Sequence, residues 1–193
     1  MINYENIYYE SSTIIVRPLQ SSDYKSFLHG YKQLLPSKNR FDEGCFDTEF
    51  MTYDWYIELL ERRKKEAEED YCYMLNIFRK KDNLSIGYCD ITPHRREEFQ
   101  YARIGYTIHN NFWGCGYGTE TVKAIVNIGF KQLNLHRLEA HINLDNHISQ
   151  HVAKKGGLLF ESVRKKFILE DGIWTDNQVF YVNNENWKSD DED

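Results

Sequence analysis

The segment Asn110–Glu120 constrains the fold of this chain more than any other part of the sequence. It reads NNFWGCGYGTE, with glycines at positions 114, 116 and 118. Glycine is favoured where a turn needs positive φ angles or a close approach of the backbone. A strand-like run precedes the segment at 101–109, and apolar residues at helical spacing follow it at 119–133. The sequence therefore predicts a strand, a tight glycine-rich turn and a helix in direct succession.

Such a turn can bind an anion. Three glycines leave the backbone N–H groups of the turn unshielded, and the first N–H groups of a helix have no partner within it. The helix dipole adds partial positive charge at the same end, so a pyrophosphate would fit there. The same turn without a ligand is the alternative, because a glycine-rich loop alone is a weak signal.

Other nucleotide and hydrolase motifs do not match. A P-loop is excluded because Lys123 lies too far into the helix, and a Rossmann motif would follow the first strand rather than come this late. No GxSxG motif accompanies a catalytic triad, which argues against a hydrolase.

The order of the other elements indicates an α/β (α+β) fold with a mixed, mostly antiparallel sheet. Alternation of Leu138, Ala140 and Ile142 with polar residues predicts a strand with one buried face. Pro18 and Pro36 are expected to end the first strand and the first helix. The predicted elements are strands at 14–17, 71–79, 85–91, 101–109, 136–144, 162–169 and 177–182, and helices at 23–35, 52–69, 119–133 and 146–155.

Length and charge suit one domain, residues 1–193, with an acidic disordered tail at about 188–193. The formal net charge is −6, and four of these charges lie in the tail, so the remainder is near neutral. Nucleic acid is therefore not an expected partner, since phosphate binding needs a basic face. No apolar run is long enough to span a membrane. Residues 1–10 lack the basic n-region of a secretory signal peptide, so a cytoplasmic protein is expected.

Cysteines and histidines do not suggest a metal site. Cys45, Cys72, Cys89 and Cys115 are widely spaced without a CxxC pair, so free thiols are expected. His147 and His151 stand at i, i+4 on the predicted helix, but no third ligand is evident. We interpret them as exposed helix residues.

The segment Trp113–Glu120 resembles motif A of the GNAT acetyltransferases, Q/R-x-x-G-x-G/A. It is most similar to the RimJ/RimL-like branch, whose members acetylate the N-termini of ribosomal proteins. Gly116 and Gly118 match the motif, while Trp113 replaces the Gln or Arg, as is common in this branch. The resemblance extends from about 14 to 182, through Arg17-Pro18-Leu19, Ile104-Gly105-Tyr106, His136 to Ala140, Asn146 with Ser149, and Asp171-Gly172.

This resemblance implies a single GNAT domain whose central strands splay apart between flanking helices. It also implies that acetyl-CoA donates its acetyl group directly to an amine, without a covalent enzyme intermediate or a metal. The implied donor-binding residues are the backbone of Tyr106, Thr107, Ile108 and His109 along the pantetheine arm, the amides of Gly114, Cys115, Gly116, Tyr117, Gly118 and Thr119 at the pyrophosphate, and Asn146 at the pantetheine.

The same resemblance suggests Ser149 as the acid that protonates the leaving thiolate. The alternative is that this hydroxyl only satisfies the first turn of its helix. The general base is less defined, because Ile168 stands where some relatives carry a glutamate. Glu139 is the candidate, directly or through water, with a solvated or ion-paired carboxylate as the alternative. Arg103, which replaces a common acidic residue, is a further departure.

The acceptor is expected to be a protein N-terminus, by resemblance, or a small amine such as a polyamine or an aminoglycoside. A different class of function also remains open, namely a non-catalytic acyl-CoA-binding sensor or interaction module. That alternative stays open because position 168 carries isoleucine rather than glutamate. The sequence leaves the oligomeric state undetermined.

Overall fold

The computed structural model describes residues 2–188. Its elements are, in order, the 3-10 helix η1 (Tyr4–Asn6), β1 (Tyr9–Glu10), β2 (Ile14–Arg17), η2 (Ser21–Asp23), α1 (Tyr24–Lys32), α2 (Tyr53–Glu68), β3 (Tyr73–Arg79), β4 (Leu84–Arg95), β5 (Tyr101–Ile108), η3 (Asn110–Phe112), α3 (Tyr117–Lys131), β6 (Arg137–Asn143), α4 (His147–Lys155), β7 (Leu159–Glu170) and β8 (Ile173–Asn183). The predicted acidic tail lies outside the described residues from position 189 onward.

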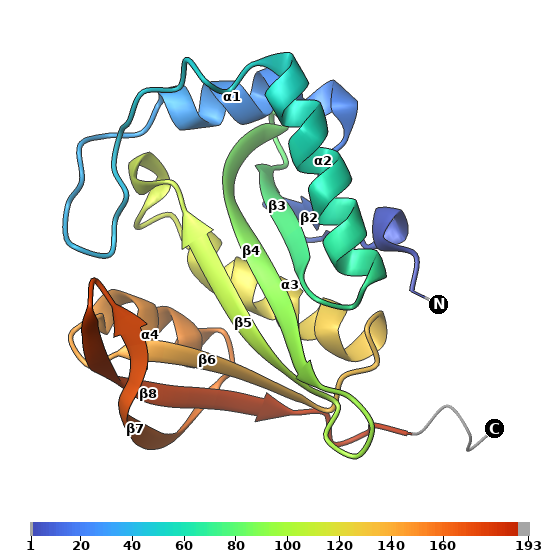
Figure 1. Cartoon of the computed structure of the whole chain (residues 1–193), viewed down its shortest axis with the longest axis vertical. Helices are drawn as coiled ribbons and strands as arrows, with labels where there is room; N and C mark the ends of the chain where they lie inside the picture. Colours follow the sequence, from blue (N-terminus) through green and yellow to red (C-terminus); the bar gives the residue numbers. More distant parts are fainter. Residues whose placement is uncertain (1, 189–193) are drawn as a thin grey trace.

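One sheet of eight strands forms the centre of the fold, in the order β1-β2-β3-β4-β5-β6-β8-β7. Its neighbouring strands are antiparallel except β5 and β6, which run parallel. These two strands share three register pairs, from Tyr101–Arg137 to Arg103–Glu139, and then separate (Figure 1). The predicted mixed, mostly antiparallel sheet with splayed central strands is confirmed.

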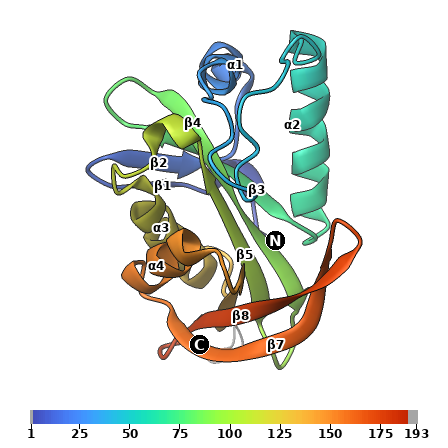
Figure 2. The ribbon, with the colours of Figure 1, turned by 90° about the vertical axis from the view of Figure 1, so that its left-hand side faces the viewer.

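Helices cover both faces of the sheet. α3 and α4 lie on one side and α2 lies on the other, as Figure 2 shows. The larger core packs beneath α3, where Val122, Ile125 and Ile128 meet Leu138 and Ile104. A smaller core beneath α1 and α2 contains Leu19, Phe27, Met51, Tyr56, Leu59 and Phe78. Burial of these apolar side chains is the main stabilising contribution of both layers.

Some predicted boundaries are wrong. The first helix ends at Lys32 rather than Leu35, because the Leu35 N–H donates to the Asn110 side chain at 2.8 Å and the chain turns away. α3 begins at Tyr117, directly after Gly116 in a left-handed conformation. The short strand β1 was not predicted, and β7 and β8 are both longer than expected.

The prediction of one buried face for the strand at 136–144 is also wrong. Leu138 and Ile142 are buried beneath the helices, but Glu139 and Asn143 on the other face are only 3% and 8% exposed. Arg137 of the same strand and Arg164 of β7 pair with the Glu139 carboxylate, which explains how it can be buried there. Within residues 2–188, no helix combines the length and apolarity needed to cross a membrane.

Candidate active site

The glycine-rich turn forms an open, concave backbone surface at the start of α3. Gly114 and Gly116 have φ angles of 81° and 85°, which side chains rarely adopt. No atom of the described chain lies within 4 Å of the position that a Cβ would take at either glycine. Gly118 serves a different purpose, because its Cβ would lie 3.2 Å from Val152 in α4. Two glycines therefore open the turn, and the third allows α3 and α4 to pack closely.

The amides of this turn are available to a ligand. The first recorded helical bond runs from the Glu120 N–H to the Gly116 carbonyl, at 3.2 Å. The N–H groups of Tyr117, Gly118 and Thr119 therefore have no acceptor inside the helix. They point out of the positive end of α3, which favours an anion.

A cavity of about 580 Å³ lies beside the turn, where β5 and β6 separate. Its walls come from the end of β5, the glycine-rich turn, one side of α4 and the segment after α1. The lining includes the sequence-predicted residues Tyr106, Thr107, Ile108, Gly114, Gly116, Tyr117, Gly118, Thr119, Asn146 and Ser149. The structure thus gathers residues more than 40 positions apart around one space.

Cys115, His109 and Glu139 are not among the residues that line this cavity. Cys115 is exposed on the turn, with a free thiol. His109 is 3% exposed, and its N–H and carbonyl are both engaged, with Ile86 at 2.8 Å and Phe112 at 2.9 Å. Its N–H is therefore not free for a ligand, and the geometry does not favour the sequence-based assignment of His109 to the donor site. Burial lowers the pKa of the His109 imidazole to about 4.

β5 offers a backbone edge to the opening. Its residues from Ile104 to Ile108 pair with β4 on one side, whereas the recorded pairing with β6 ends at Arg103. Ile108 is the last residue of β5, and its carbonyl already accepts a hydrogen bond from the Trp113 indole N–H at 2.7 Å. The accessible backbone edge is therefore the stretch from Ile104 to Thr107.

Ser149 and Tyr106 form a hydroxyl pair at the cavity wall. The Tyr106 hydroxyl lies 2.9 Å from both the hydroxyl and the carbonyl oxygen of Ser149. A carbonyl only accepts, so when both bonds form, Tyr106 donates to the carbonyl and accepts from the serine. Burial raises the pKa of Tyr106 to about 12, so the phenol stays protonated at neutral pH. Asn146 fixes this end of α4, because its side-chain oxygen accepts from the Ser149 N–H at 3.1 Å.

Glu139 lies in a saturated ion cluster. Arg137 donates to one carboxylate oxygen at 2.8 Å, and Tyr101, His141 and Arg164 contact the other at 2.9, 2.9 and 3.2 Å. Burial alone would raise its pKa, but the hydrogen bonds from His141, Arg137 and Tyr101 lower it to about 2. A carboxylate so strongly held is a poor proton acceptor. The geometry favours the ion-paired interpretation over a general base.

Several residues that line the cavity were not predicted from the sequence. His147, His151 and Lys155 lie along one side of α4 and face the cavity, at i, i+4 and i+8. The spacing of His147 and His151 predicted exposed helix residues, with a metal pair as the alternative, and no role was predicted for Lys155. Asn39 and Phe41, from the segment after α1, close the other side. Among residues 2–188, no group of three or more potential ligands could hold a metal ion.

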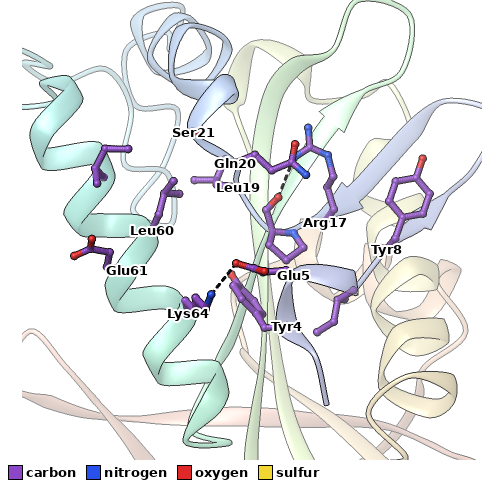
Figure 3. Close-up of a pocket in the computed structure, with 13 residues that line it drawn as sticks. Tyr4, Glu5, Tyr8, Arg17, Leu19, Gln20, Ser21, Leu60, Glu61 and Lys64 are labelled. Atoms are coloured by element: carbon purple, nitrogen blue, oxygen red, sulfur yellow. Dashed lines mark hydrogen bonds and ion pairs between the residues drawn. The ribbon is translucent and has the colours of Figure 1, made fainter. Parts of the chain in front are cut away.

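A second cavity, of about 640 Å³, lies between η1, β2 and α2 (Figure 3). It shares no lining residue with the cavity beside the glycine-rich turn. Its rim carries the exposed pair of Lys64 and Glu5 at 2.8 Å, and Arg17 on its wall is held by Asp23. Glu5, Lys64 and Arg17 on the wall of this cavity therefore already have ion-pair partners.

Comparison with known proteins agrees with this geometry. The acetyltransferase (GNAT) domain family matches residues 13–159. A probable N-acetyltransferase of Bacillus subtilis, YjcK, is 30% identical over 179 residues, covering 91% of this chain and 96% of that protein.

Solved structures share the fold at lower identity. The ribosomal-protein-S5-alanine acetyltransferase of Vibrio fischeri is 21% identical with a TM-score of 0.74, covering 95% of this chain and 100% of that one. RimJ of Mycobacterium smegmatis, in complex with CoA-disulfide, is 18% identical with a TM-score of 0.76, covering 97% of this chain and 92% of that one. The extent of the family match, together with YjcK, establishes that this chain belongs to the GNAT family of N-acetyltransferases.

Proposed function

We propose that this chain transfers the acetyl group of acetyl-CoA directly to a primary amine. The cavity at the β5–β6 opening carries the proposal, because one end has an anion-binding backbone and the other has a hydroxyl pair. The residues fit such a donor. The turn is open where phosphates would approach Gly114 and Gly116, and β5 has an unpaired edge for an extended amide-bearing arm.

Each part of the site has a distinct role in this proposal. The amides of Tyr117, Gly118 and Thr119 bind the pyrophosphate, and Lys155 on the wall of the same cavity adds positive charge. The β5 edge from Ile104 to Thr107 orients the pantetheine arm. Positioning of this kind supplies much of the rate in a direct transfer.

Ser149 then donates a proton to the sulfur as the C–S bond breaks. Tyr106 keeps the serine hydroxyl at the cavity wall. When the serine proton turns from Tyr106 to the sulfur, the Tyr106 hydroxyl can turn from the Ser149 carbonyl and donate to Oγ. No cysteine is required, because the amine attacks the thioester directly. The exposed Cys115 is therefore outside the proposed chemistry.

For the acceptor, a protein or peptide N-terminus is our first proposal. It is supported by the fold similarity to the ribosomal-protein-S5-alanine acetyltransferase. A small amine such as a polyamine is the alternative within the same reaction.

Two measurements on the purified protein test the proposal. Calorimetry should detect acetyl-CoA binding, and thiol release should follow when a peptide beginning with alanine or serine, or spermidine, is added. Binding without turnover on any amine would instead favour a non-catalytic acyl-CoA sensor. Absence of binding would reject both.

A further inference from the structure

We propose that Asp90, on β4, binds and deprotonates the ammonium group of the acceptor directly above Gly105 of β5. This assignment rests on the proposed acetyl transfer and adds a site for the second substrate. It places that site on the face of the sheet opposite the donor cavity.

Gly105 makes room for the carboxylate. Asp90 and Gly105 are register partners on neighbouring strands. A Cβ at Gly105 would lie 2.2 Å from Asp90 Oδ1, so this oxygen occupies the space that any side chain would fill. Gly105 does not have a positive φ angle, so its backbone does not require glycine. The close approach of Asp90 is the feature that requires it.

One oxygen of Asp90 is anchored and the other is available. Oδ2 accepts from Arg103 at 2.8 Å and from Thr92 at 2.9 Å. Oδ1 has no hydrogen-bond partner within residues 2–188. It is not among the fully buried atoms that lack a partner, and the side chain is 13% exposed, so the oxygen is accessible. A carboxylate held by one edge, with its second oxygen open, is well placed to accept a hydrogen bond from an ammonium group.

The position of Asp90 along the sheet coincides with the opening. The last recorded β5–β6 pair is Arg103–Glu139, so Gly105 lies two residues beyond the point where the strands separate. Successive residues of a strand face opposite sides of the sheet. Tyr106, which holds Ser149, therefore faces the donor cavity, and Gly105 faces the other side only about 3.8 Å away along the chain.

Such an arrangement suits aminolysis of a thioester. Asp90 removes one proton from the ammonium group, and the free amine forms the C–N bond from its own face of the sheet. The C–S bond breaks on the other face, where Ser149 supplies a proton to the sulfur. The nitrogen loses its second proton to solvent as the amide forms. Asp90 then returns its proton to solvent and Ser149 regains one, so the complete turnover releases one proton. No oxidant, metal or further reactant is needed.

Glu139 is less suited than Asp90 to deprotonate the acceptor. Its two oxygens receive hydrogen bonds from four side chains, including two guanidinium groups. Asp90 has one guanidinium partner and keeps one oxygen open.

Two variants test the assignment, with the acceptor being whichever of the alanine peptide, the serine peptide or spermidine the wild type acetylates fastest. Asp90→Asn should lower kcat/KM for that amine by about 100-fold or more at neutral pH and leave acetyl-CoA binding within about twofold. The deficit should shrink as pH rises, because more of the amine is already deprotonated. Gly105→Ala should give the same loss by displacing the carboxylate.

Asp70→Asn is the matched control. Asp70 accepts two hydrogen bonds from Arg96, at 2.7 and 2.6 Å, so its loss breaks an ion pair that includes no residue of the donor cavity and no partner of Asp90. It should lower the melting temperature but keep kcat/KM within about threefold of wild type. If Asp90→Asn keeps kcat/KM within about threefold at all pH values, the assignment is wrong while the proposed function stands. If the wild type acetylates none of the three amines, both fail.

Discussion

Gly116→Val is the most direct test of how the glycine-rich turn works, because the chain supplies its own control. Gly116 has a φ angle of 85° and Gly172, in the β7–β8 turn, has one of 80°. Neither has an atom of the described chain within 4 Å of its Cβ position. A valine therefore causes backbone strain at both sites without a clash at either, and only one site faces the donor cavity.

The expected magnitudes follow from that comparison. A non-glycine residue in the left-handed region costs about 1–3 kcal/mol, and the β-branched valine should lie toward the upper end. Both variants should then melt several degrees below wild type, by about 2–4 °C for each kcal/mol in a chain of this size. Gly116→Val should in addition weaken acetyl-CoA binding at least tenfold, about 1.4 kcal/mol, because its side chain fills the space where phosphates approach.

Thermal melts and acetyl-CoA calorimetry on the two variants separate strain from occlusion. Gly172→Val should share the stability loss and keep the wild-type dissociation constant. An unchanged dissociation constant in folded Gly116→Val would refute phosphate binding at the turn. If acetyl-CoA binding is weakened equally in both variants, backbone strain rather than a side chain in the turn controls the affinity for acetyl-CoA.

Further predictions concern the chemistry and the buried charges. Ser149→Ala should lower turnover about 100-fold with donor binding nearly unchanged, and a loss below about threefold in steady-state kinetics would contradict its acid role. Tyr106→Phe should lower turnover less, and a double-mutant cycle should show that the two losses are not additive. Cys115→Ala should keep most of its turnover, whereas mass-spectrometric detection of an acetylated cysteine would contradict direct transfer. The pKa of Glu139 is lowered on folding to about 2, so its stabilising effect is present above the unfolded pKa of about 4.3 and is lost as pH falls toward 2. Glu139→Gln should therefore lower the free energy of unfolding strongly at pH 7 and much less at pH 3, as measured by urea denaturation.

The local patterns of this sequence predicted most of the fold. Glycines at 114 and 116 specify a turn that few other residues could form. The position of this turn then determines where the preceding strand ends and the following helix begins. The order of strands and helices followed from apolar periodicity. The splay between β5 and β6 came from the resemblance to a family, because no local signal states where two strands stop pairing.

Contacts between distant segments explain what the sequence did not predict. His109 was expected at the donor, but a hydrogen bond from its amide to Ile86 of β4 places it in the core instead. Glu139 alternates with apolar residues as an exposed carboxylate would, yet Arg164 from β7 and Tyr101 from β5 enclose it. Arg137 and His141 of the same strand also hold Glu139, but without the two distant side chains the carboxylate would not be enclosed. Tertiary packing decided both.

The alternation of β5 explains how one strand can serve two substrates without mixing their chemistry. Ile104, Tyr106 and Ile108 face the helices α3 and α4, where the donor cavity lies, while Arg103 and Gly105 face the other side, next to Asp90. An insertion of one residue in this strand would reverse both sets at once. The proposed acid and the proposed base therefore depend on a single register, held by the β4 pairing from Ile91–Ile104 to Gly87–Ile108. Because that pairing also aligns Asp90 with Gly105, the same hydrogen-bonded ladder that stabilises the sheet positions the two proton-transfer groups on opposite sides of the opening.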